Sequence, residues 1–324
     1  RFGQSSGSYS TMTSLSELTT IKVGGTPKQL LVAKTKQEII DYALQIWDAT
    51  ENWLVLGAGS NIVANDFLGN LQVIKIATAG IEEIDGVVRV QAGVDWNELV
   101  STANNHGWQG LESLAGIPGT VGAAPIQNIG AYGQEVSKVI KSVEFLDYET
   151  REVIIIDQEF CNFGYRDSVF KQGRKGIVLS VDFIFGSELS SVLNQRSEEV
   201  LAQRKAKGMV LDDKDPDTFS CGSFFVNPFV SESFARTLPI DAPQFPEGDR
   251  IKLSAAWLIE KSGVAKGFSL PGSKAAVSSK HSLAITNRGG ATANEIVELA
   301  SFIQTQVGNH FGIYLVPEPN LIGF

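Results

Sequence analysis

The stretch from Ser113 to Gly133, SLAGIPGTVGAAPIQNIGAYG, constrains the fold of this chain more than any other segment. Its 21 residues include five glycines and two prolines, and none of them is charged. Surface loops usually carry charges, and the interior of a helix or strand does not tolerate so many breakers. Two interpretations are open. The stretch is either a buried turn between packed elements or a backbone surface whose N–H groups cradle a cofactor with phosphates and rings.

Composition narrows the classes of protein to which the chain can belong. A length of 324 residues predicts two or three domains. A net charge of −9 argues against nucleic acid or an anionic membrane as the main partner, and no apolar run approaches the ~20 residues of a membrane span. Cys161 and Cys221 form neither a zinc motif nor a disulfide framework, which favours a reducing cytoplasm. We expect residues 1–10 to be an added tag or a disordered leader.

Helix and strand patterns alternate along the chain, which predicts an α+β or α/β fold. Thr35 with Glu38, and Thr292 with Glu295, have the spacing of capping boxes at helix starts. The expected helices cover residues 36–49, 95–105, 190–206, 253–262 and 293–311. The expected strands cover residues 54–56, 71–76, 87–92, 139–147, 152–156, 177–185 and 313–324. The acidic run 209–219 is expected to be a solvated linker and a domain boundary.

A second glycine-rich loop, Gly57-Ala58-Gly59-Ser60-Asn61, follows a predicted strand as a phosphate-binding loop should. It is not a dinucleotide fingerprint of the GxGxxG type, because Ile62 stands where the third glycine belongs. By itself it is compatible with a plain turn. Together with residues 113–133, it favours a dinucleotide spread over both loops.

Three polar groups could carry chemistry, and each also has a structural interpretation. Arg166, in Tyr165-Arg166-Asp167-Ser168, can clamp a carboxylate, or form a surface ion pair with its neighbouring Asp. Ser223 precedes two phenylalanines and can donate a proton, or cap a turn. Glu318 lies between two prolines, which restrict the backbone on both sides of it. Its carboxylate is either held in one direction for a functional role or part of an exposed structural turn.

No metal site is expected. Asp213, Asp215 and Asp217 resemble the start of a calcium loop, but Thr218 stands where that loop requires glycine. The three histidines lie far apart in the sequence and form no ligand motif.

Five segments in order along the chain resemble the UDP-N-acetylenolpyruvoylglucosamine reductase family, flavoenzymes of bacterial cell-wall synthesis. They are LGAGSN at 56–61, IPGTVGAAPIQNIGAYG at 117–133, YRDSVFK at 165–171, GSFFVNP at 222–228 and VPEPNLIG at 316–323. The segments at 204–225 and 251–268 are most similar to actinobacterial members. The resemblance spans essentially the whole chain after residue 15.

The resemblance implies a vanillyl-alcohol-oxidase-like (PCMH-type) FAD-binding unit of two subdomains, followed by an α+β substrate domain. The first subdomain would cover residues 11–75 with the tail 313–324, the second 76–208, and the substrate domain 209–312. It implies non-covalent FAD reduced by NADPH, which leaves before UDP-N-acetylglucosamine enolpyruvate binds. Hydride then passes from flavin N5 to C3 of the enolpyruvyl ether. The protein is expected to be a cytoplasmic monomer without nucleic-acid or membrane partners.

The resemblance also assigns residues. Arg166 would bind and polarise the substrate carboxylate, Glu318 in its protonated form would donate to the growing charge, and Ser223 would protonate C2. Tyr165, Asn227 and Lys207 would be further substrate contacts. Because the tyrosine loop of some relatives is missing here, Lys207 and the regions of Lys261 and His281 are candidates to cover the substrate diphosphate. Cofactor contacts are expected from Gly57, Ala58, Gly59, Ser60, Asn61, Gly116, Ile117, Pro118, Gly119, Val121, Gly122, Gln127, Asn128, Gly130, Ala131, Tyr132 and Gly133.

Two alternatives remain open from the sequence. A related FAD-dependent oxidase of an alcohol or hydroxy acid would often tether its flavin through a loop histidine, and neither glycine-rich loop contains one. A non-catalytic binder of a sugar nucleotide is disfavoured by the joint presence of Arg166, Ser223 and Glu318.

The tyrosine loop that covers the substrate diphosphate in some relatives has no counterpart between Lys171 and Ser187.

Overall fold

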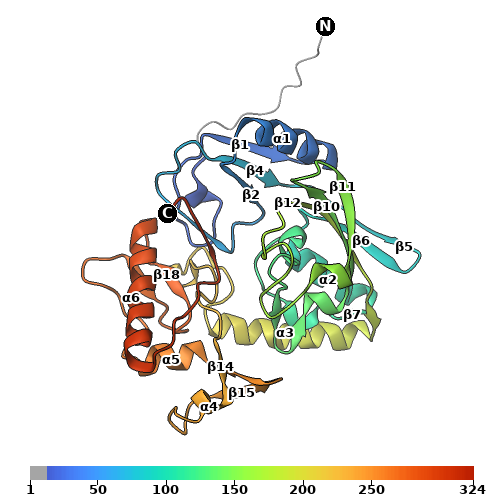
Figure 1. Ribbon diagram of the computed structural model, residues 1–324. Helices are drawn as coiled ribbons and strands as arrows, with labels where there is room; N and C mark the ends of the chain where they lie inside the picture. Colours follow the sequence, from blue (N-terminus) through green and yellow to red (C-terminus); the bar gives the residue numbers. More distant parts are fainter. Residues whose placement is uncertain (1–12) are drawn as a thin grey trace. The chain divides into compact units, whose positions relative to one another are not determined.

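The computed structural model describes residues 13–324, which divide into two compact units (Figure 1). The first unit contains Pro27–Gly59 and Gly69–Lys205, and the second contains Ser14–Thr26, Ser60–Leu68 and Ala206–Phe324. Each unit has its own hydrophobic core. The leader predicted at residues 1–10 lies outside the described residues.

The first unit begins with a three-stranded parallel sheet in the order β1-β4-β2. Its strands are β1 (Gln29–Ala33), β2 (Trp53–Leu56) and β4 (Gln72–Ile76). Helix α1 (Lys36–Ala49) packs on β1 and β4 (Figure 1). Its start is set by the predicted capping box, in which Thr35 and Glu38 each accept the other's backbone N–H. Ile39, Ala43 and Ile46 then fall on the buried side, as the helical period requires.

A five-stranded antiparallel sheet, β11-β10-β12-β6-β5, forms the rest of the first core. Its strands are β5 (Ile81–Ile84), β6 (Val87–Gln91), β10 (Ile140–Asp147), β11 (Val153–Asp157) and β12 (Gly176–Phe183). The central strand β12 is buried along nearly its whole length. Its mostly apolar sequence, in which only Ser180 and Asp182 are polar, suits a strand covered on both faces.

Helices and short elements complete this unit. Helix α2 (Trp96–His106) starts at Asp95, whose carboxylate accepts two backbone N–H groups, and ends at Gly107 in the left-handed region. Helix α3 (Ser190–Ala206) ends the unit. The remaining elements are β7 (Trp108–Gln109), β8 (Gly130–Ala131), β9 (Gln134–Glu135), β13 (Gly186–Ser187) and the 3₁₀ turns η2 (Glu112–Leu114), η3 (Val121–Ala123), η4 (Val136–Lys138) and η5 (Gln158–Cys161).

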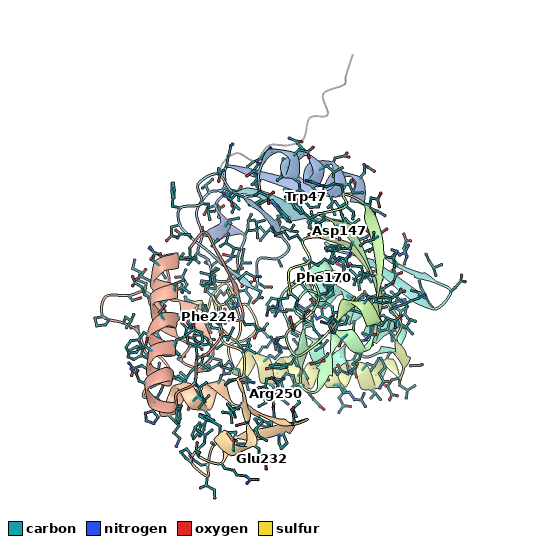
Figure 2. The ribbon with its side chains drawn as sticks, in the orientation of Figure 1. Trp47, Asp147, Phe170, Phe224, Glu232 and Arg250 are labelled. Carbon is teal, nitrogen blue, oxygen red and sulfur yellow. The ribbon has the colours of Figure 1, made fainter. Side chains whose placement is uncertain are left out.

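The second unit packs small sheets against one long helix, α6 (Ala293–Phe311). Its sheets are the parallel pair β3 (Ile62–Ala64) and β19 (Asn320–Ile322), the antiparallel pair β17 (Ala275–Val277) and β18 (Ile285–Asn287), and β14-β16-β15. The last sheet is formed by β14 (Phe229–Ser231), β15 (Gln244–Glu247) and β16 (Arg250–Leu253). Helices α4 (Glu232–Ala235) and α5 (Ala255–Lys261) and the turns η1 (Leu15–Glu17) and η6 (Pro216–Thr218) complete it. Phe224 is fully buried in this core, and its side chain is labelled in Figure 2.

The structure confirms the expected helices and most expected strands, and it corrects two segments. Only Asn320–Ile322 of the expected strand 313–324 is a strand. The run 209–219 is solvated only in part: residues 211–214 are exposed, but the Asp217 carboxylate accepts hydrogen bonds from Ser278 and Ser279. Asp215 is also paired with Lys280 at 2.6 Å. The three-part division of the chain stays a prediction.

Candidate active site

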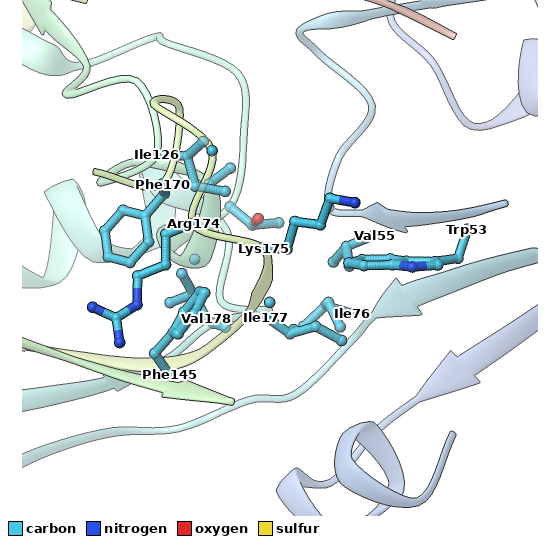
Figure 3. A pocket seen from close by; sticks show the side chains of 17 residues that line it. Trp53, Val55, Ile76, Ile126, Phe145, Phe170, Arg174, Lys175, Ile177 and Val178 are labelled. Atoms are coloured by element: carbon cyan, nitrogen blue, oxygen red, sulfur yellow. The ribbon is translucent and has the colours of Figure 1, made fainter. Parts of the chain in front are cut away.

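A cavity of about 260 Å³ lies inside the first unit, and both glycine-rich loops contribute to it (Figure 3). Gly57 follows the end of β2, and Thr120 and Gly122 belong to the long uncharged stretch. Most other lining side chains are apolar, and β2, β4, β10 and β12 supply six of them. The two loops predicted to cooperate therefore meet around one space.

Two glycines are required here by close approach rather than by backbone conformation. A Cβ on Gly57 would lie 2.5 Å from the Thr120 hydroxyl oxygen. A Cβ on Gly122 would lie 2.6 Å from Ala92 Cβ. The Gly122 N–H donates to the Ala92 carbonyl at 2.8 Å, which holds η3 against the end of β6. Larger residues at either position would push the loops apart and change the cavity.

Three basic side chains lie at the first loop or line the cavity. Lys75 Nζ donates to the Gly57 carbonyl at 3.1 Å, and burial lowers the pKa of this lysine. Arg174 and Lys175 both line the cavity. The Asp147 carboxylate pairs with Arg174 at 3.0 Å. Burial opposes ionisation of Asp147, but hydrogen bonds from Thr150, Arg174 and Glu149 outweigh it and keep the pKa of this carboxyl below its ordinary value.

Arg166 lies in a two-residue turn held against the uncharged stretch. Gly164 and Asp167 exchange backbone hydrogen bonds of 3.0 and 3.2 Å, and Tyr165 and Arg166 connect them. Arg166 has a φ of 53°, an unusual backbone conformation for a side chain of this size. Its Nη2 donates to the Gly130 carbonyl at 2.7 Å, and its guanidinium carbon lies 5.4 Å from the centre of the Tyr165 ring.

Asn128 ties this turn to the uncharged stretch. Its side-chain amide donates to the Gly164 carbonyl at 2.9 Å and to Glu135 at 3.1 Å, while its carbonyl accepts the Ser137 N–H. Asn128 is also 1% exposed. The structure therefore gives this residue a positioning task beside Arg166, and a direct cofactor contact from its amide stays a prediction.

Arg204 is a charged residue whose importance the sequence does not reveal. Its position near the end of α3 suggests only a favourable interaction with the helix dipole. In the structure it is 9% exposed, and burial lowers its pKa. Arg166 lowers this pKa further, whereas Tyr132 raises it. Gly116 makes room for this part of the helix, since a Cβ there would lie 2.7 Å from Leu201 Cδ2.

The second unit brings Ser223 and Glu318 onto adjacent segments of chain. Phe225 and Pro317 form an antiparallel bridge, and the Glu318 N–H donates to the Phe224 carbonyl at 2.8 Å. Both Ser223 and Glu318 are half-buried. Two motifs separated by more than 90 residues in the sequence thus lie side by side.

The end of the first glycine-rich loop joins the same arrangement. The Asn320 N–H donates to the Asn61 carbonyl at 3.0 Å, and the Asn61 side-chain amide donates to the Glu318 carbonyl at 3.4 Å. The pairing of β3 with β19 continues this contact. Asn61 therefore has a structural partner in the tail that the loop sequence alone does not suggest.

The predicted substrate contacts have diverse surroundings. Asn227 is half-buried, and its side-chain carbonyl accepts the Ala255 N–H at 2.9 Å. Lys261 is exposed, pairs with Asp241 at 2.8 Å and lies 5.6 Å from the Trp257 ring centre. Lys207 is exposed and His281 is half-buried, both in the second unit, whereas Tyr165 belongs to the first. Their roles stay predictions.

Sequence reasoning missed several residues around the cavity. Thr120 lies within the glycine-rich stretch 113–133, which was predicted to act together with the loop at 57–61. Its closeness to Gly57 could therefore have been predicted. Trp53 and Lys175 line the cavity and belong to no motif. Lys75, which contacts the Gly57 carbonyl, also belongs to no motif, and the pairing of β2 with β4 brings it there.

Comparison with known proteins identifies the family. Residues 27–156 match the model of an FAD binding domain, and residues 215–322 match that of the UDP-N-acetylenolpyruvoylglucosamine reductase C-terminal domain. A UDP-N-acetylenolpyruvoylglucosamine reductase from Leifsonia xyli is 43% identical, with 95% of this chain and 98% of that protein covered. The chain belongs to the UDP-N-acetylenolpyruvoylglucosamine reductase family. A reductase of the same name from Mycobacterium sp. strain MCS is 39% identical, with 95% of each chain covered.

A solved structure supports the same assignment. The UDP-N-acetylenolpyruvylglucosamine reductase from Thermus caldophilus is similar with a TM-score of 0.71 and 28% identity, over 95% of this chain and 97% of that one. The predicted resemblance, including its actinobacterial character, and the predicted fold class are confirmed. The protein is an FAD-dependent oxidoreductase.

The residues present fit a bound dinucleotide. The close approaches at Gly57 and Gly122 leave two stretches of backbone facing a cavity whose other walls are mostly apolar. Backbone N–H groups at such loops suit phosphates, and apolar walls suit ring systems. In the described part of the chain, no helix has the length and apolar character needed to cross a membrane.

Proposed function

We propose that the protein reduces UDP-N-acetylglucosamine enolpyruvate to UDP-N-acetylmuramate with electrons from NADPH, in the synthesis of peptidoglycan precursors. The observation that carries this proposal is the adjacency of Ser223 and Glu318 in the second unit, through the Phe225–Pro317 bridge. Reduction of an enolpyruvyl ether needs a proton donor and a group that stabilises charge on the carboxylate. Family membership supports the same reaction.

Bound FAD would supply the hydride, and the chain would supply the binding and proton chemistry. We assign Arg166 to the substrate carboxylate, because its planar guanidinium can form paired hydrogen bonds with two oxygens. Its contacts with Gly130 and Tyr165 would keep the guanidinium oriented before substrate arrives. Tyr165 would contact the substrate beside it.

Ser223 is assigned as the donor of a proton to C2. Its neighbours Phe224 and Phe225 are almost fully buried, so the backbone that carries the hydroxyl is fixed by the core. Glu318 is assigned to the developing charge on the carboxylate and must be protonated to donate a hydrogen bond. The Glu318 N–H bond to the Phe224 carbonyl holds the two segments in register.

The chain contains one pair of glycine-rich loops, which accounts for one bound dinucleotide, FAD. We therefore propose that NADPH and the enolpyruvyl substrate occupy the same place in turn. We also propose that the protein acts as a monomer in the cytoplasm. Both cysteines are free thiols in the structure, which supports a reducing compartment. Burial raises the pKa of Cys161 to about 11 and that of Cys221 to about 12, so neither is a reactive thiolate at neutral pH.

The test is a pair of half-reactions followed by flavin absorbance without oxygen. NADPH should bleach the bound flavin, and UDP-N-acetylglucosamine enolpyruvate should then restore the oxidised spectrum. A flavin that stays bleached after addition of the enolpyruvyl substrate contradicts the proposed function. Bleaching of the flavin by a small alcohol or hydroxy acid in the absence of NADPH would favour the oxidase alternative.

A further inference from the structure

One end of the cavity in the first unit is formed by an aromatic side chain from β2. Trp53 lines the cavity together with Val55, two residues further along the same strand face (Figure 3). Opposite them in the view lie Phe145 and Phe170. Trp53 is half-buried, so it is neither a core residue nor a freely exposed one.

The Trp53 ring is held in place by surrounding side chains. It stacks on Tyr148 with ring centres 5.7 Å apart and an angle of 25° between the planes. It also contacts Trp47, with ring centres 5.4 Å apart. The Tyr148 hydroxyl donates to Glu51 at 2.5 Å, and Lys175 Nζ lies 5.6 Å from the centre of the Tyr148 ring. A ring fixed in this way loses little conformational entropy when a ligand stacks on it.

The size of the cavity indicates how much of a dinucleotide it accepts. Its volume of about 260 Å³ is below the roughly 300–1,000 Å³ of sites for drug-sized ligands. One end of FAD would fill such a space, and the remainder would extend along the glycine-rich loops. Arg166, which we assign to the substrate carboxylate, does not line the cavity, so the reacting flavin ring belongs elsewhere.

We propose that Trp53 stacks on the adenine of bound FAD and makes this chain selective for FAD over FMN. FMN carries the flavin and one phosphate but lacks the adenosine portion, so it cannot use the Trp53 end of the cavity. Tyr148 acts as a positioning residue that holds the Trp53 ring. The inference rests on the FAD chemistry of the proposed function and goes beyond it by naming the residue that selects the cofactor.

The proposal predicts a selective loss of affinity. Stacking of a base on an aromatic side chain is worth roughly five- to 150-fold in affinity when it is removed by alanine substitution. Trp53→Ala should therefore weaken FAD binding by about tenfold or more and leave FMN binding unchanged. Trp53→Phe keeps a ring and should recover most of the FAD affinity.

The experiment uses flavin-free protein titrated with FAD, FMN and ADP in a calorimeter, with tryptophan fluorescence recorded in parallel. ADP should quench fluorescence in the wild type, and Trp53→Ala should abolish that change. Phe160→Ala is the control, because Phe160 is 65% exposed and does not line the cavity. It should leave both flavin affinities unaltered.

The outcomes separate this inference from the cofactor assignment. Equal weakening of FAD and FMN in Trp53→Ala, with no recovery in Trp53→Phe, would show general damage to the site and overturn the role of Trp53. Unchanged FAD affinity in Trp53→Ala would overturn it too. Failure of the wild-type protein to bind FAD at all would overturn the cofactor assignment and this inference together.

Discussion

Addition of a single methyl group at Gly122 should disturb both the fold and the cofactor site. The Cβ of an alanine there would lie 2.6 Å from Ala92 Cβ and 3.1 Å from both Ala92 Cα and the Ala92 carbonyl oxygen. Real Cβ atoms essentially never approach within 3.0 Å, so η3 must move away from the end of β6. Overpacking of this kind costs about 1–3 kcal/mol.

Stability and cofactor affinity should fall together, because Gly122 also lines the cavity. Each kcal/mol corresponds to a decrease of about 2–4 °C in Tm for a unit of 150–250 residues. We therefore expect Gly122→Ala to lower the Tm of the flavin-free protein by about 2–12 °C. Thermal unfolding followed by circular dichroism measures the first effect, and calorimetric titration with FAD measures the second.

Two further variants test the cause. Ala92→Gly removes the nearest atom, so Ala92→Gly with Gly122→Ala should lose less stability than the sum of the two single losses. Gly308→Ala places its methyl on α6 at an ordinary van der Waals distance, 3.9 Å from the Ile313 carbonyl oxygen, and should be neutral or slightly stabilising. Strict additivity in the double variant, or an unchanged FAD affinity in Gly122→Ala, would refute the reasoning.

Three other changes test the site and the fold. Ser223→Ala should leave reduction by NADPH near normal and slow reoxidation by the enolpyruvyl substrate by about 10²–10⁴-fold, and equal slowing of both half-reactions in stopped flow would contradict the proton-donor role. Arg166→Lys loses the planar donor pair, so reoxidation should slow although charge is kept, and a normal rate would argue against carboxylate binding. Hydrogen bonds from Thr292 and Lys274 lower the pKa of Glu295, so its stabilisation is present above the unfolded pKa of about 4.3 and is lost as pH falls through the lower folded value. The difference in urea stability between wild type and Glu295→Gln should therefore shrink between pH 6 and pH 3, and a constant difference would exclude this linkage.

The local elements of this protein are readable from its sequence because their causes are local. The capping boxes at Thr35 and Thr292 start α1 and α6 where predicted, since each joins residues only three positions apart. The motifs also led to the family, which the comparisons confirm. The acidic character of the run 209–219 predicts solvation, which holds for residues 211–214 but not for Asp217, whose hydrogen-bond partners lie about 60 residues away.

Tertiary structure decided which of these pieces act together. The glycines of the uncharged stretch 113–133 indicate that its backbone packs closely against another segment. The sequence does not identify that segment, which the structure shows to include Gly57 and Ala92. Trp53 and Arg204 carry no motif, and their surroundings come from strands and helices distant in the chain. Helix propensity and capping depend on residues a few positions apart, so the sequence alone shows which residues interact. Burial and pairing depend on which distant segments share a core, and only the folded chain settles that.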